Sequence, residues 1–94
     1  MITHIIFLKL KDSASNAEKI KALLLDMEGK VPQLRHVEVG LNVQGSERAY
    51  DLALVTKFDS LDDLEAYKIH PVHVEVGKQI ALVKEAAASV DYES

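Results

Sequence analysis

Hydrophobic residues alternate with other residues at the start of the chain, which predicts a β-strand over residues 2–11. His4 falls on the more apolar face of this strand. A capping-box pattern at Ser15–Glu18 precedes apolar residues at helical spacing and predicts a helix over residues 15–28. Gly29 offers a stop directly after that helix.

Two further strands are predicted in the middle of the chain. Apolar and polar residues alternate over residues 36–43 and again over residues 50–58. The intervening stretch Gln44–Arg48 contains glycine and serine, which favours a hairpin turn. We therefore expect these two strands to pair in antiparallel orientation.

Two helical segments and one strand are predicted in the last third of the chain. Ser60 followed by Asp63 has the form of a helix start, with Asp in place of the preferred Glu or Gln. Pro71 begins a second helical segment, because its missing N–H is harmless at the first position of a helix. Weaker alternation over Ala87–Tyr92 predicts a fourth strand.

The resulting order, β-α-β-β-α-β, is that of an α+β, ferredoxin-like subunit, in which helices cover one face of an antiparallel four-stranded sheet. The length predicts a single domain over residues 1–94. The opposite face of the sheet also carries apolar residues, so we expect a second copy of the chain to cover it and to form a homodimer with a shared α/β barrel. These residues are Ile5, Phe7, Ala53 and Val55.

Composition and charge exclude several classes of function. A net charge of −4 removes the attraction that drives most binding to nucleic acid and to anionic membranes, so we expect neither partner. The absence of cysteine excludes disulfides, thiol catalysis and cysteine-ligated metals. The first ten residues resemble neither a signal peptide nor a membrane span, and we expect a cytoplasmic protein.

The segment around the predicted helix break carries the candidate chemistry. Tyr67, His70 and His73 lie close together there. Imidazole suits general acid–base catalysis because its ordinary pKa lies near neutrality, and a phenol can donate to a carbonyl or enolate oxygen. The alternative is structural: Tyr67 belongs to the core, His70 caps a helix end and His73 lies on the surface.

We predict that Tyr67 and His73 form a catalytic pair at a cavity between the sheet and the helices. The predicted ligand-contacting residues are His4, Ile6, Leu8, His70 and Val76. No carboxylate stands at a ligand spacing beside the two histidines of the helix break, so we expect no cofactor and no transition metal. The sequence leaves open a loosely held magnesium ion at backbone carbonyls of residues 31–37.

Four segments of the chain carry a family likeness: His4–Lys11, Val37–Gly40, Tyr50–Leu54 and Tyr67-x-x-His70-Pro71-x-His73. They resemble the Dabb family of stress-responsive dimeric α/β barrel proteins, and the resemblance extends over essentially the whole chain. It implies a ferredoxin-like subunit that dimerises through its sheet. In a plant branch of polyketide cyclases, the tyrosine and second histidine of the helix-break motif act as an acid–base pair, which implies these roles for Tyr67 and His73, with His4 in the same pocket.

Two functional hypotheses follow. In the first, a homodimer binds a small hydrophobic or carbonyl-containing molecule, with cofactor-independent activity of the cyclase, lyase or isomerase kind at Tyr67 and His73. The chain has two Phe, three Tyr and no Trp, which favours an aliphatic ligand over a large aromatic one. In the second, the protein is a structural stress protein that acts as a stable oligomer without a substrate. Whether the chain is an enzyme stays open at this point.

Overall fold

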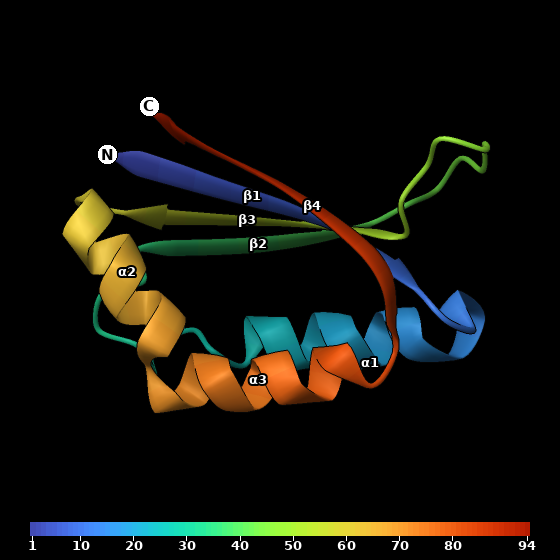
Figure 1. The fold of residues 1–94 in the computed structure, drawn as a ribbon, viewed down its shortest axis with the longest axis horizontal. Coiled ribbons are helices and arrows are strands. Elements are labelled where there is room, and N and C mark those ends of the chain that lie inside the picture. The colour runs from blue at the N-terminus through green and yellow to red at the C-terminus, as the bar shows by residue number, and fades with distance from the viewer.

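Four strands form one antiparallel sheet in the order β2-β3-β1-β4, and three helices lie on one face of it (Figure 1). The computed structural model describes all of residues 1–94. This architecture confirms the predicted α+β, ferredoxin-like fold. The elements are β1 (Ile2–Leu10), α1 (Ser13–Leu25), β2 (His36–Leu41), β3 (Leu52–Phe58), α2 (Leu61–Ile69), α3 (Pro71–Ala81) and β4 (Lys84–Glu93).

The helix break between α2 and α3 forms as the sequence predicts. Ser60 caps α2, and its hydroxyl oxygen accepts a hydrogen bond from the N–H of Asp63 at 3.1 Å. His70 has an extended backbone, because the ring of the following proline disfavours the helical conformation at the residue before it. Pro71 then occupies the first turn of α3. The chain therefore changes direction between the two helices.

Helix α1 differs from its predicted range at both ends. It begins at Ser13 and ends at Leu25, whereas residues 15–28 were expected. The capping box at Ser15 was wrong, because Asp12 takes the N-cap position in a left-handed conformation (φ 45°) and its carbonyl accepts the N–H of Ser15. Gly29 also has a positive φ of 81°, but it lies in the turns that follow the helix.

Strand ends also differ from the alternation pattern. The connection between β2 and β3 covers residues 42–51 and extends away from the sheet (Figure 1), so it is longer than the predicted turn. Val43 continues the alternation in sequence, yet it is 99% exposed. Asp51 lies just before β3, and its carboxylate accepts the N–H of Leu10 at 2.7 Å. In contrast, β4 begins at Lys84, three residues earlier than expected.

The hydrophobic core lies between the sheet and the helices. Phe58 and Met27 are completely buried there, and Tyr67 is 1% exposed. The opposite face of the sheet is open in the single chain: Phe7 is 42% exposed and Val90 is 52% exposed. No helix of the chain combines the length and the apolar composition that crossing a membrane requires.

Candidate functional site

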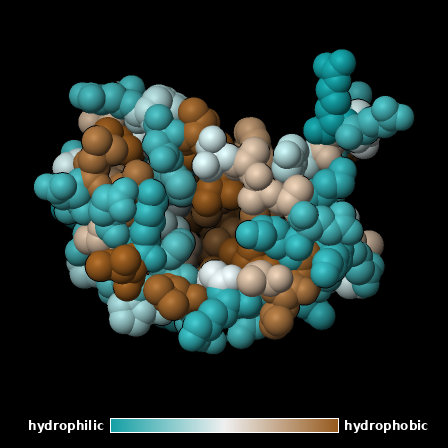
Figure 2. Space-filling view, in the orientation of Figure 1, coloured by the Kyte–Doolittle hydropathy of each residue, from teal (hydrophilic) through white to brown (hydrophobic).

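A cavity of about 190 Å³ lies between the sheet and α3. Figure 2 shows an apolar hollow between these two layers. The floor of the cavity consists of buried residues from both the sheet and the helices. Its mouth is formed by the exposed residues Gly77, Lys84 and Ala87. The lining residues are Ile6, Leu8, Leu24, Leu54, Tyr67, His73, Val76, Gly77, Ile80, Lys84 and Ala87.

Tyr67 reaches the cavity from α2. Its ring packs against Phe58, with 4.9 Å between ring centroids, and against His73, with 4.3 Å between centroids. The hydroxyl makes no hydrogen bond within the chain, and it is not among the buried polar atoms cut off from solvent. Burial raises the pKa of Tyr67 well above its usual value, so the phenol stays protonated and can donate a hydrogen bond to a molecule in the cavity.

His73 lines the same cavity from the first turn of α3. Its Nδ1 lies 3.0 Å from the carbonyl oxygen of Lys68. Because a carbonyl oxygen only accepts, Nδ1 must donate, and in the neutral ring Nε2 is then a free acceptor. Burial is the main cause that lowers the pKa of His73, while the hydrogen bond to Lys68 opposes that effect. The imidazole is therefore neutral at neutral pH, with one nitrogen ready to take a proton.

His4 lies behind Tyr67 and is not among the residues that line the cavity. Its ring meets the ring of Tyr67 in an edge contact, with centroids 6.5 Å apart. The Nδ1 of His4 is hydrogen-bonded to the carboxylate of Asp91, which stands directly opposite in the pairing of β1 with β4. Asp91 therefore holds the ring of His4 against Tyr67. The sequence-based predictions did not include the carboxylate of Asp91.

The structure brings together most of the predicted site residues but leaves two of them, His4 and His70, outside the cavity lining. Ile6, Leu8 and Val76 line the cavity with Tyr67 and His73. His70 does not line it. Its Nδ1 accepts the N–H of Val72 at 3.1 Å, so the imidazole caps α3. No group of three histidine and carboxylate side chains gathers at a metal-binding distance.

Sequence reasoning missed all three residues at the cavity mouth, Gly77, Lys84 and Ala87. Gly77 follows His73 by four positions, and that helical spacing was a signal that could have placed both on one face of α3. A Cβ added at Gly77 would meet no atom within 4 Å, so the missing side chain leaves open space there. Lys84 had no comparable signal, because alternation along β4 was weak and its start was expected three residues later.

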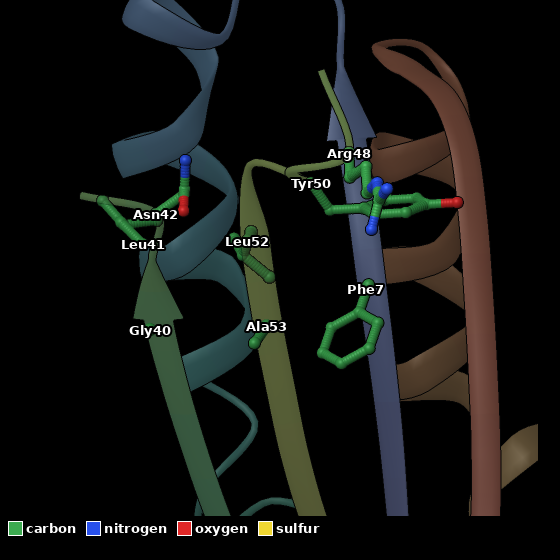
Figure 3. Close-up of a pocket in the computed structure, with 8 residues that line it drawn as sticks. All are labelled: Phe7, Gly40, Leu41, Asn42, Arg48, Tyr50, Leu52 and Ala53. Atoms are coloured by element: carbon green, nitrogen blue, oxygen red, sulfur yellow. The ribbon is translucent and has the colours of Figure 1, made fainter. Parts of the chain in front are cut away.

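A second hollow of about 390 Å³ lies on the other face of the sheet. Figure 3 shows Phe7, Tyr50 and Ala53 around it, from β1, from the connection before β3 and from β3 itself. The rings of Phe7 and Tyr50 have centroids 6.0 Å apart. Arg48 also lines the hollow, but no histidine or carboxylate does. This hollow occupies the apolar face that the sequence predicts as a contact with a second copy.

The fold and the cavity together define a class of protein: a ferredoxin-like α+β subunit with an apolar site between its sheet and its helices. The chain belongs to the Dabb family, because the family model for the stress responsive A/B barrel domain matches residues 2–94. This match confirms the family that the sequence motifs indicate.

Relatives of known sequence or structure support this assignment. The stress-response A/B barrel domain-containing protein DABB1 of Arabidopsis thaliana is 27% identical over 99 residues, which cover 98% of this chain but only 46% of DABB1. Olivetolic acid cyclase of Cannabis sativa is 29% identical over 80 residues, or 81% of this chain and 79% of the cyclase. A dimeric protein of unknown function and ferredoxin-like fold from Bacteroides fragilis is 36% identical, with a TM-score of 0.89 over 99% of this chain and 95% of that one.

Proposed function

We propose that the chain binds a small carbonyl compound in the cavity and moves a proton at the carbon next to the carbonyl, with no cofactor. His73 is the general base, and Tyr67 donates a hydrogen bond to the developing oxyanion. The observation that carries this proposal is the hydrogen bond from Nδ1 of His73 to the carbonyl of Lys68, which leaves Nε2 unprotonated beside a neutral phenol. The relationship to a protein named as a cyclase agrees with such acid–base chemistry.

The proposed steps balance without a further reactant. Nε2 of His73 takes a proton from the α-carbon, and the electron pair of that C–H bond forms the carbon–carbon double bond of an enolate. The carbonyl π pair moves to oxygen, where the hydroxyl of Tyr67 donates a hydrogen bond. The enolate carbon then takes the proton back from the imidazolium, or it attacks a second carbonyl group of the same molecule, whose alkoxide oxygen takes that proton. Either path restores neutral His73.

Cavity size and lining indicate the kind of ligand. Its volume of about 190 Å³ lies below the roughly 300–1,000 Å³ that drug-sized ligands occupy. Leu8, Leu24 and Leu54 form aliphatic walls, and Tyr67 is the one aromatic residue among the lining set apart from the imidazole of His73. These features favour a short aliphatic compound over a large aromatic one.

Enolisation of a simple ketone tests the proposal without knowledge of the natural substrate. The protein is expected to accelerate exchange of the α-protons of 2-hexanone in D₂O, as followed by NMR. Gly77→Leu should lower that acceleration by about tenfold or more, because a leucine at the mouth fills the space that the ketone must enter. Gly77→Ala is the matched control, and it should keep the activity while stabilising α3 by about 0.5–1 kcal/mol.

Two outcomes of the exchange experiment would contradict the proposal. If the wild-type protein produces no acceleration, the enzymatic function is wrong, and the structural stress protein becomes the better description. If Gly77→Leu exchanges as fast as Gly77→Ala, the reaction takes place somewhere other than this cavity.

We also propose that residues 1–94 form one domain and that two copies dimerise through the open face of the sheet. Exposure of Phe7, Val90 and Tyr92 supports this proposal, because a contiguous apolar face is uncommon on a monomer. In a two-fold symmetric contact, this face of one copy covers the same face of the other copy. The related protein from Bacteroides fragilis is dimeric, which agrees with it.

Val55→Asp is expected to raise the dimer dissociation constant by about tenfold or more, because each copy would then place an unpaired charge in the contact. Light scattering over a dilution series measures the effect. Val74→Asp is the matched control, since Val74 is 41% exposed on α3, on the helix side of the sheet, and should leave the dimer intact. A wild-type protein that is monomeric at micromolar concentration would rule out the dimer.

A further inference from the structure

A bulge in β4 turns one lysine toward the cavity. Strands β1 and β4 pair residue by residue until a register shift between Lys9 and Leu10. Lys9 pairs with Ala86, but Leu10 pairs with Lys84, so Glu85 is passed over. Directly opposed residues of an antiparallel pair point to the same face, and Leu10 is buried on the helix side of the sheet. Lys84 is therefore on that side too, where regular alternation would have placed Glu85.

Lys84 is the only residue with a formal charge among those that line the cavity, apart from the titratable His73 and Tyr67. No aspartate or glutamate belongs to the lining. The side-chain ammonium of Lys84 forms neither an ion pair nor a hydrogen bond, in contrast to those of Lys30 and Lys68, which pair with Asp26 and Glu65. A cation without a partner thus stands at the mouth of an apolar cavity in a protein whose net charge is −4.

We propose that Lys84 binds the carboxylate of the ligand at the cavity mouth, so that the ligand is a short aliphatic oxo acid. This assignment rests on the proposed function only where it places the carbonyl group of the ligand next to Tyr67 and His73. The exposed position of Lys84 leaves the carboxylate partly hydrated, so little desolvation opposes binding. The aliphatic part of the ligand then lies against Leu8, Leu24 and Leu54, and its carbonyl group reaches Tyr67 and His73.

Two probes of nearly equal shape and different charge isolate the contribution of Lys84. Hexanoate is expected to bind about fivefold more tightly than hexanamide, which is the upper range for a partly exposed ion pair. Binding is measured by NMR titration of the backbone amides around the cavity. Lys84→Met should bring the two affinities together, and Lys84→Arg should preserve the preference. Lys78→Met is the matched control, because Lys78 lies on α3 outside the cavity lining and should leave the preference unchanged.

Ionic strength provides a second measurement on the unaltered protein. Added salt should weaken the binding of hexanoate and leave the binding of hexanamide unchanged, because only the former contains an ion pair. Equal affinity of the two probes for the wild-type protein would overturn the proposal, as would no binding of hexanoate at all. A preference that persists in Lys84→Met, or is lost in Lys78→Met, would also overturn it.

The outcome is separable from that of the proposed function, since the titration measures binding preference and not turnover. If His73 plays no part in proton transfer, hexanoate still binds in preference to hexanamide. If Lys84 plays no part, hexanoate and hexanamide bind the wild-type protein equally, while the wild-type protein still exchanges the α-protons of 2-hexanone, because that ketone has no carboxylate.

Discussion

His73→Gln is expected to slow the α-proton exchange of 2-hexanone by about 10²–10⁴-fold, the usual contribution of a positioned general base. Glutamine is close in length to histidine, and its amide N–H can still donate to the carbonyl of Lys68. It offers no basic nitrogen to the cavity. A lower rate constant therefore reports loss of the base and not loss of the hydrogen bond to Lys68. The rate constant is measured by NMR at saturating and at low ketone concentration.

His36→Gln is the matched control for this substitution. His36 is exposed on β2, where its Nε2 lies 3.6 Å from Glu38, and it does not line the cavity. The exchange rate of His36→Gln should equal that of the wild-type protein. Equal loss in both variants would point to a general effect on folding, and no loss in His73→Gln would remove the catalytic role of His73.

The pH dependence of the exchange rate follows from the same imidazole. Burial lowers the pKa of His73 below the ordinary value of 6.5, so the neutral, basic form persists to lower pH than it would in a free imidazole. The rate should therefore be flat through neutral pH and should fall only on the acid side of pH 6.5. An inflection above pH 6.5 would show that another group controls the reaction.

Tyr67→Phe is expected to slow the same exchange by about 10²–10³-fold, the usual effect of deleting one oxyanion donor. The hydroxyl has no partner within the chain, so its removal leaves no buried donor or acceptor unsatisfied. The aromatic ring keeps its contacts with Phe58 and His73. Thermal unfolding should therefore change little, while the rate falls.

Tyr50→Phe is the matched control for the phenol. Tyr50 lies on the other face of the sheet against Phe7, at the hollow of Figure 3, and its hydroxyl is remote from His73. Loss of the Tyr50 hydroxyl should leave the exchange rate unchanged. A Tyr67→Phe protein that exchanges at the wild-type rate would mean that the ring of Tyr67 serves packing alone. Because burial raises the pKa of Tyr67, no loss of rate from its ionisation is expected near neutral pH.

Local signals in the sequence determined most of the secondary structure. Ser60 and Pro71 act on the backbone within a few residues, so their effects could be predicted from neighbouring residues alone. The start of α1 was predicted at the wrong residue because Asp12, and not Ser15, is the N-cap. The position of the N-cap depends on where β1 ends. Alternation predicted the faces of the strands but not their ends, as Val43 shows.

Tyr67 and His73 were predictable as a pair because one helix break carries both residues. His70 shares that break, yet its side chain caps α3, since the extended backbone before Pro71 turns it away from the cavity. Asp91 and Lys84 are different, because both reach the site through the pairing of β4 with β1, across most of the chain. A bulge in that pairing decides which face a side chain joins, and its position depends on contacts between distant strands. The sequence by itself therefore determined the fold and the catalytic candidates. Only the tertiary structure decided which charged side chains, those of Asp91 and Lys84, lie near these candidates.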